Sequence, residues 1–107
     1  MNTDRELLEL AAKAAGVGWI KDCVWIENGF YSPLAKHERI AWNPLIDDGD
    51  ALRLAVKFLF EIDMGRGCIA IRHATGIKVL EAFNHDPYAA TRRAIVRAAA
   101  EIGRGME

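Results

Sequence analysis

The sequence is poor in cysteine and in net charge, and it has no long apolar run. Its 107 residues contain only two cysteines, Cys23 and Cys68. Two cysteines in apolar, strand-like contexts make neither a disulfide framework nor a zinc site, so we expect both to be reduced and buried. No apolar run approaches the about 18 residues that span a bilayer, and residues 1–15 lack the pattern of a secretory signal. We therefore expect a cytoplasmic protein with no membrane partner.

A net charge of −1 excludes a strong overall attraction to nucleic acid or to anionic membranes. The charges are unevenly placed, however, because residues 43–50 are acidic and residues 86–107 carry four arginines. With 51% hydrophobic and 27% charged residues, the composition is that of a soluble globular protein. The length suits one domain, residues 1–107, with one core.

The first helix is predicted from its two ends. Thr3 and Glu6 have the spacing of a capping box, in which each side chain accepts a free backbone N–H of the first turn. Gly16 supplies the left-handed residue that ends the helix. Its apolar positions recur at helical spacing: Leu7, Leu10, Ala11, Ala14 and Ala15. Because most of these side chains are small, we expect a close approach to the surface on which the helix packs.

A second helix is predicted from Asp47 or Asp48 to about Phe60, with acidic residues at the positive end of its dipole. The residues expected to form its buried stripe are Ala51, Leu52, Ala55, Val56 and Leu59.

A third helix is predicted to start at Asp86 as the cap, with Pro87 at the first helical position, and to end at Gly103. The residues expected to form its apolar stripe are Tyr88, Thr91, Ile95, Ala98, Ala99 and Ile102.

Two regions between the helices have strand character. Trp19–Ile26 is rich in β-formers, Asn28-Gly29 is a hairpin signal, and Phe30-Tyr31 would return as the second strand. A loop over residues 36–39 and a short strand over 40–42 would follow. Residues 60–64, 69–73 and 77–83 alternate in polarity, as in an antiparallel meander. The predicted order α-β-α-β-β-β-α is that of an α+β layered sandwich of one antiparallel sheet and three helices, which cover both faces or group on one.

Three long segments also resemble a known family. The segments Asp4–Gly16, Trp42–Ala55 and Asp86–Gly103 are similar to the phage ABA sandwich domain, a family of small phage and prophage proteins. The resemblance implies a sheet held between helical layers and a bacterial host, and it brings no catalytic residue or cofactor with it. Ile46 departs from the pattern, since a small polar residue often precedes the paired aspartates there.

The residues that could carry chemistry have simpler explanations. Helix capping accounts for Asp47, Asp48 and Asp50, whose layout is not that of a calcium loop. His37, His73 and His85 share no helical spacing, and we expect His73 to be a partly buried, hydrogen-bonded residue of a strand. The only serine, Ser32, precedes a proline outside any nucleophile elbow. We therefore expect no enzymatic activity, no metal and no cofactor.

Two groups of residues remain as binding candidates. Arg92, Arg93 and Arg97 could contact phosphates, or they could form a solvated helix face in which Arg97 pairs with Glu101. The aromatic residues Trp19, Phe30 and Trp42 could be core residues, or an exposed cluster that binds protein. From these features we predict a non-enzymatic module that binds a phage or host protein or a second copy of itself. A weak nucleic-acid binder using the last helix is the alternative, and an enzyme of unknown class is the least favoured hypothesis.

Overall fold

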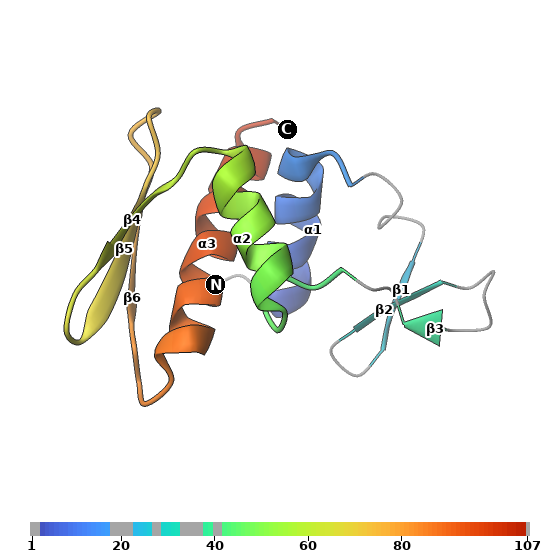
Figure 1. Ribbon diagram of the computed structural model, residues 1–107. Coiled ribbons are helices and arrows are strands. Elements are labelled where there is room, and N and C mark those ends of the chain that lie inside the picture. The colour runs from blue at the N-terminus through green and yellow to red at the C-terminus, as the bar shows by residue number, and fades with distance from the viewer. Residues whose placement is uncertain (1–2, 18–22, 27–28, 33–37, 40–41, 107) are drawn as a thin grey trace.

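The computed structural model describes residues 3–17, 23–26, 29–32, 38–39 and 42–106. Within these ranges the chain forms three helices and two three-stranded antiparallel sheets (Figure 1). The helices are α1 (Asp4–Ala15), α2 (Asp48–Lys57) and α3 (Pro87–Arg104). The prediction of an α+β fold is confirmed, and each predicted helix is present.

The strands divide between a small sheet and a main sheet. The small sheet contains β1 (Val24–Ile26), β2 (Gly29–Ser32) and β3 (Glu38–Arg39), in that order. The main sheet contains β4 (Glu61–Met64), β5 (Cys68–Arg72) and β6 (Lys78–Ala82), also in chain order. The predicted meander is therefore confirmed, and its outer strands are β4 and β6.

The first β region differs in detail from its prediction. Ile26 pairs with Gly29, so Gly29 is the first paired residue of β2 and not a turn residue. The third strand lies at Glu38–Arg39, where a loop was predicted. Trp42 lies outside any strand, and residues 40–41 lie outside the described ranges. The pairing of β3 with β2, which sets Arg39 opposite Tyr31 and Glu38 opposite Ser32, decides where this strand forms.

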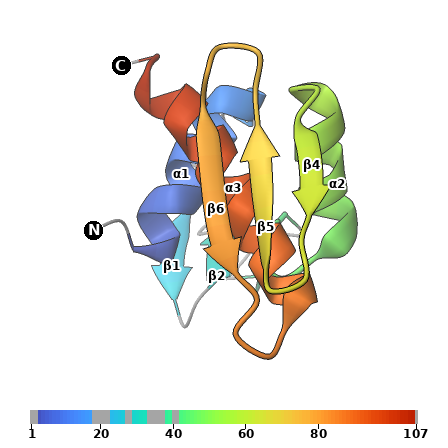
Figure 2. The same cartoon turned by 90° about the vertical axis from the view of Figure 1, so that its left-hand side faces the viewer.

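All three helices lie on the same side of the main sheet, and the small sheet lies beyond them (Figures 1 and 2). The opposite face of the main sheet carries no helix in these views. The helices therefore group on one face, which is one of the two arrangements that the sequence left open. It differs from the family resemblance, which implies a sheet held between helical layers. In the described ranges, no helix is both long and apolar enough to cross a membrane.

Helix α1 begins and ends as predicted and packs closely on α3. The Thr3 Oγ1 accepts the Glu6 N–H at 3.2 Å, and Gly16 adopts a φ of 78° at the helix end. Leu8, Ala11 and Ala12 are fully buried against alanines of α3. Small side chains on both helices permit this short separation, as the alanine-rich sequence predicts.

Helix α2 begins at the Asp47 cap, whose carboxylate accepts the Asp50 N–H at 2.8 Å. It ends at Lys57, three residues before the predicted end. The prediction of its buried stripe is wrong in part. Leu54 is buried with Ala51 and Ala55, because α3 covers that side of the helix. The larger residues of the predicted stripe are exposed instead: Leu52, Val56 and Leu59.

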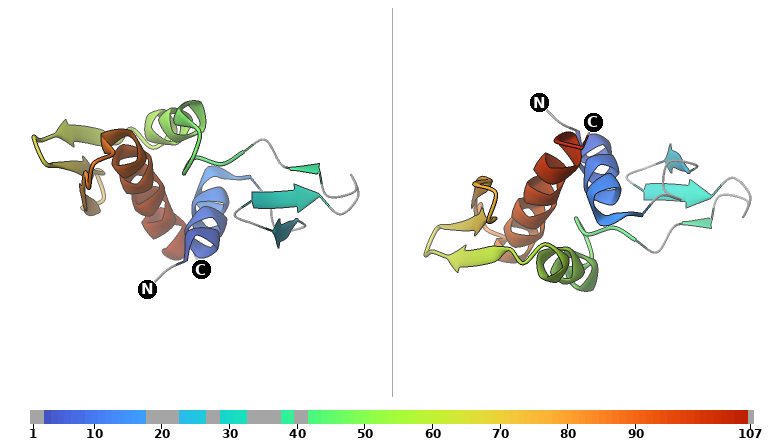
Figure 3. Two further views of the ribbon diagram at one scale, coloured as in Figure 1. Left: turned by 90° about the horizontal axis from the view of Figure 1, so that it is seen from below. Right: turned by 90° about the horizontal axis from the view of Figure 1, so that it is seen from above.

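Helix α3 also begins as predicted, since the Asp86 carboxylate accepts the Ala89 N–H at 3.0 Å. Two details are corrected. Tyr88 is 71% exposed, because the first turn of α3 lies at the end of the helix away from α1 (Figure 3). Gly103 does not end the helix, which runs to Arg104, and its site is buried against α1.

Candidate protein-binding groove

Of the three aromatic residues that could be core residues or an exposed cluster, the structure describes Phe30 and Trp42. Phe30 is buried, and its ring meets that of Trp25 edge-on at 4.9 Å between centroids. Trp42 is half-buried against the core. Trp19 lies outside the described residues. Phe30 is therefore a core residue, because β2 turns its side chain toward the interior.

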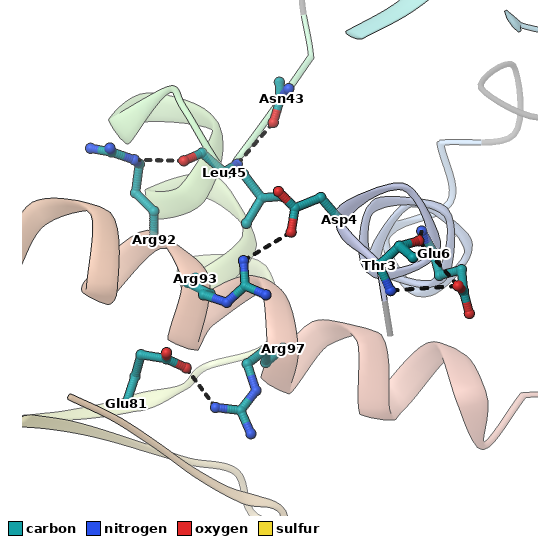
Figure 4. A network of polar contacts seen from close by, with 9 residues as sticks. All are labelled: Thr3, Asp4, Glu6, Asn43, Leu45, Glu81, Arg92, Arg93 and Arg97. Atoms are coloured by element: carbon teal, nitrogen blue, oxygen red, sulfur yellow. Dashed lines mark hydrogen bonds and ion pairs between the residues drawn. The ribbon is translucent and has the colours of Figure 1, made fainter. Parts of the chain in front are cut away.

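The three arginines of α3 that the sequence marks as binding candidates, Arg92, Arg93 and Arg97, lie in two different places, and each donates to protein acceptors (Figure 4). Arg92 faces the start of α2, where it donates to the Leu45 carbonyl at 2.9 Å and to Asp48 at 2.7 Å. Arg93 donates to Asp4 of α1 at 2.9 Å. These bonds connect α3 to segments far away in the sequence.

Arg97 donates to the Glu81 carboxylate at 2.5 Å and to the Leu80 carbonyl at 3.0 Å, both on β6. The expected pair of Arg97 with Glu101 is wrong, since Glu101 accepts from Arg104 at 3.4 Å. The sheet places Glu81 beneath α3, so Arg97 binds residues of β6 and not Glu101 of its own helix.

Arg93 and Arg97 line a cleft of about 740 Å³ between α1, β6 and α3. Its charges are mixed: Lys78 adds a third cation, whereas Glu81 and Glu101 also line the cleft. Arg92 is not among its lining residues. The three arginines therefore do not form one continuous positive face, which is the surface that phosphate contacts would need.

An apolar groove lies on the other side of α3, between that helix, α2 and β4. It has a volume of about 470 Å³, and its floor includes Ala51 and Ile95. Its walls carry four large apolar side chains that are between 41% and 71% exposed: Leu52, Ile62, Met64 and Tyr88. We call this feature the α2–β4–α3 groove. Asp48 and Arg92 lie at its polar end and bind each other.

The apolar surface continues from the groove along α2. Val56 follows Leu52 by one helical turn, and Leu59 follows after the helix ends. Six of the nine large apolar residues exposed in the described part of the chain belong to the groove walls or to this extension. Scattered exposed apolar residues are ordinary, but a cluster of this kind marks a binding surface.

The two edges of the main sheet differ. The Gly65 N–H donates to the Cys68 carbonyl at 2.8 Å, so the backbone groups of Gly65 point toward β5. Along an antiparallel ladder, residues alternate between pairs that are hydrogen-bonded to each other and pairs that are not. The backbone groups of Ile62 and Met64 therefore point away from β5, and no further described strand pairs with β4. At the other edge, the same alternation turns the Leu80 carbonyl outward, where it accepts from Arg97. A guanidinium therefore occupies one outward carbonyl of β6, whereas no described residue binds the outward groups of Ile62 and Met64 on β4.

The catalytic candidates stay apart. His73 is half-buried and hydrogen-bonded, as predicted, with its Nδ1 2.7 Å from the Thr75 hydroxyl and its ring edge-on to Phe60. His85 is exposed, and His37 lies outside the described residues. In the described ranges, no three His, Cys, Asp or Glu residues are grouped as metal ligands. Cys68, predicted to be buried, is exposed on the helix-free face of the main sheet.

Comparisons with protein-family models, with curated proteins and with solved structures found no match to this sequence. The resemblance to the phage ABA sandwich domain therefore stays a proposal, and the candidate surface is defined by its own geometry.

The sequence did contain one signal for the groove. Ala51, Leu52, Leu54, Ala55 and Val56 place apolar side chains around more than half of the circumference of α2. One packed neighbour covers a stripe of about 100°. A helix with so wide an apolar surface either has two covered sides or leaves one side for a partner.

Proposed function

We propose that the protein is a non-enzymatic protein-binding module, and that the α2–β4–α3 groove is its binding surface. The observation that carries the proposal is the gathering of exposed Leu52, Ile62, Met64 and Tyr88 around one apolar groove. Removing such side chains from water is the main favourable term in most protein association. The resemblance stated above supports a phage or prophage origin and a place of action in the bacterial cytoplasm.

The backbone at Leu59 supports the same proposal. Leu59 has a φ of 55° and is 84% exposed, in a turn where its N–H donates to Val56 and the Phe60 N–H donates to Ala55. This bonding pattern ends a helix with a left-handed residue, which is usually glycine. An exposed leucine at this position costs backbone strain and gains no burial in the free protein. A partner that covers the side chain would supply that burial.

We therefore expect Leu59→Gly to stabilise the free protein by about 1 kcal/mol, because glycine adopts a positive φ without strain. The same variant should bind its partner more weakly, since it removes apolar contact area. Chemical denaturation measures the first effect. Leu59→Ala is the matched control, because it shortens the side chain but keeps the strain; a similar stability gain in that variant would contradict this explanation.

The proposal is tested by photo-crosslinking from the groove. A photoreactive phenylalanine derivative replaces Tyr88 in one variant and Leu80 in the other, and both are expressed in the organism that encodes the protein. Tyr88 is 71% exposed and Leu80 is 57% exposed, so both sites are accessible. Leu80, however, lies on the helix-free face of the sheet, away from the groove. We expect one discrete, nuclease-resistant protein adduct from position 88 and none from position 80.

Two further variants link that adduct to the groove. Leu52→Glu introduces an unpaired charge into the groove wall and should reduce the adduct at least about tenfold. Leu80→Glu, a substitution of similar exposure on the other face, should leave it unchanged. An adduct that disappears with nuclease would favour the nucleic-acid alternative, and equal adducts from both positions would contradict the groove.

A further inference from the structure

We infer that the open edge of β4 binds an extended segment of a partner protein, in which apolar residues alternate with lysine or arginine. The inference rests on the proposed function and specifies its partner. The segment would add a fourth strand to the main sheet. Its apolar side chains would enter the α2–β4–α3 groove, and its basic side chains would lie on the helix-free face.

The backbone of β4 offers hydrogen-bonding groups along the open edge. Ile62 and Met64 each present an N–H and a carbonyl to the open edge, as the alternation of the ladder requires. The Phe60 N–H is already donated to Ala55 at 3.0 Å, so the free edge begins after it. A strand that adds to such an edge gains main-chain hydrogen bonds, and pockets for alternate side chains give it specificity.

The side chains of β4 decide which residues of an added strand would face the groove. Ile62 and Met64 pair with the buried residues Ile71 and Ile69, so they stand on the face toward the helices and line the groove. Residues of an added strand that point to the same face would stand beside them. The groove therefore accepts every second side chain of the added strand, and these side chains must be apolar.

The charges select the other residues of the added strand. Glu61 and Asp63 stand on the helix-free face, and both bind one guanidinium, that of Arg72, at 3.3 and 3.2 Å. Their side chains are still 71% and 58% exposed. Lys78 pairs with Arg72 from β6, which lies on the other side of β5 from β4 and so away from the open edge. The edge itself thus carries two carboxylates, and opposite charges across a strand pair are favourable.

The same charges disfavour a second copy of the chain as the occupant. Two β4 strands paired antiparallel around a two-fold axis would place residues of one face opposite each other. In a pairing centred on Ile62, Glu61 would meet Asp63 of the second copy, and in one centred on Asp63 that residue would meet its own equivalent; a pairing centred on Met64 would reach beyond the end of β4. Like charges directly opposite are destabilising, so the occupant is a different, basic strand.

Selection from a display library of random twelve-residue peptides tests the inference with the folded chain as bait. We expect enriched sequences with four to six residues that alternate apolar with Lys or Arg and lack proline. Enriched apolar residues at helical spacing, or acidic residues in the alternate positions, would overturn strand addition but would leave the groove as a binding site. No enrichment over an empty support would count against the proposed function itself.

An enriched peptide then tests the edge directly. Met64→Pro removes an N–H that the sheet does not use, a change that edge strands tolerate. We expect it to weaken binding about tenfold more than Met64→Ala, which removes the same side chain but keeps that N–H. Equal loss in both variants would contradict main-chain pairing.

The two carboxylates of β4 are tested by a separate variant, which does not depend on whether the proline variant folds. Glu61→Lys with Asp63→Lys changes two exposed side chains and should shift the preference from basic to acidic alternating peptides. Unchanged preference would overturn the charge assignment. Sedimentation of the unmodified protein tests the second copy as the occupant. A dimer that Met64→Pro abolishes and Met64→Ala leaves intact would overturn the inference in favour of a second copy, whereas a dimer that neither variant changes forms elsewhere and agrees with it.

Discussion

Gly103→Ala is expected to destabilise the protein by about 3 kcal/mol, the upper part of the range for overpacked cores. A Cβ at this position would lie 2.0 Å from the Leu10 carbonyl oxygen and 2.8 Å from its carbon. Both are backbone atoms of α1, so no side-chain rotation relieves the clash, and α1 must move away from α3. Alanine favours helix over glycine by up to about 1 kcal/mol, which is too little to offset that movement.

Gly105→Ala is the matched control, because its new Cβ would meet its nearest neighbour, the Ile102 carbonyl oxygen, at 3.5 Å, an ordinary contact. Gly105 has a φ of −70°, which alanine adopts freely. We expect its free energy of unfolding to change by less than about 0.5 kcal/mol. Urea denaturation measures both variants. A Gly103→Ala protein as stable as the parent would mean that the two helices are not held at this separation.

Asp50→Ala is expected to cost about 3 kcal/mol, because it removes the acceptor of a buried backbone group. Asp50 is 5% exposed, and its Oδ2 accepts the Asn43 N–H at 2.8 Å. Asn43 is itself buried, and its carbonyl and side chain accept N–H groups of the turn that precedes α2. A buried donor left without an acceptor costs about 1–3 kcal/mol, and the turn would lose its attachment to the helix.

Two variants separate this hydrogen bond from the ion pair at the same carboxylate. Arg53 donates to Asp50 at 2.5 Å, but its side chain is 73% exposed. Arg53→Ala should therefore cost less than about 1 kcal/mol. Asp50→Asn keeps an oxygen that can accept the Asn43 N–H and should cost less than alanine. An Arg53→Ala effect as large as that of Asp50→Ala would assign the stability to the ion pair instead.

The features that could be predicted from the sequence are those fixed by near neighbours. The caps at Thr3, Asp47 and Asp86 each involve a residue three positions further along the chain. The αL glycine at position 16 and the alternation of the meander are equally local. These elements form wherever the chain folds, so their recognition needs no knowledge of tertiary structure.

The candidate site could not be predicted because it depends on what the fold leaves uncovered. The period of apolar residues in α2 is the same whether α3 covers Leu54 or Leu52. Likewise, the alternation of β4 does not say that β4 is an edge strand, which follows from the order of the sheet. Gly103 was interpreted as a helix end because its role, contact with the Leu10 backbone, joins residues at opposite ends of the chain.

The difference between the two edges of the main sheet also sets the direction in which a further strand can extend it. Sheets that are open on both sides can template repeated addition and grow into fibres. Here Arg97 occupies the outward carbonyl of Leu80, so growth through β6 is obstructed. Strands would therefore join the main sheet from the β4 side only, and two copies of the protein could not be linked edge to edge through β6 without displacing Arg97.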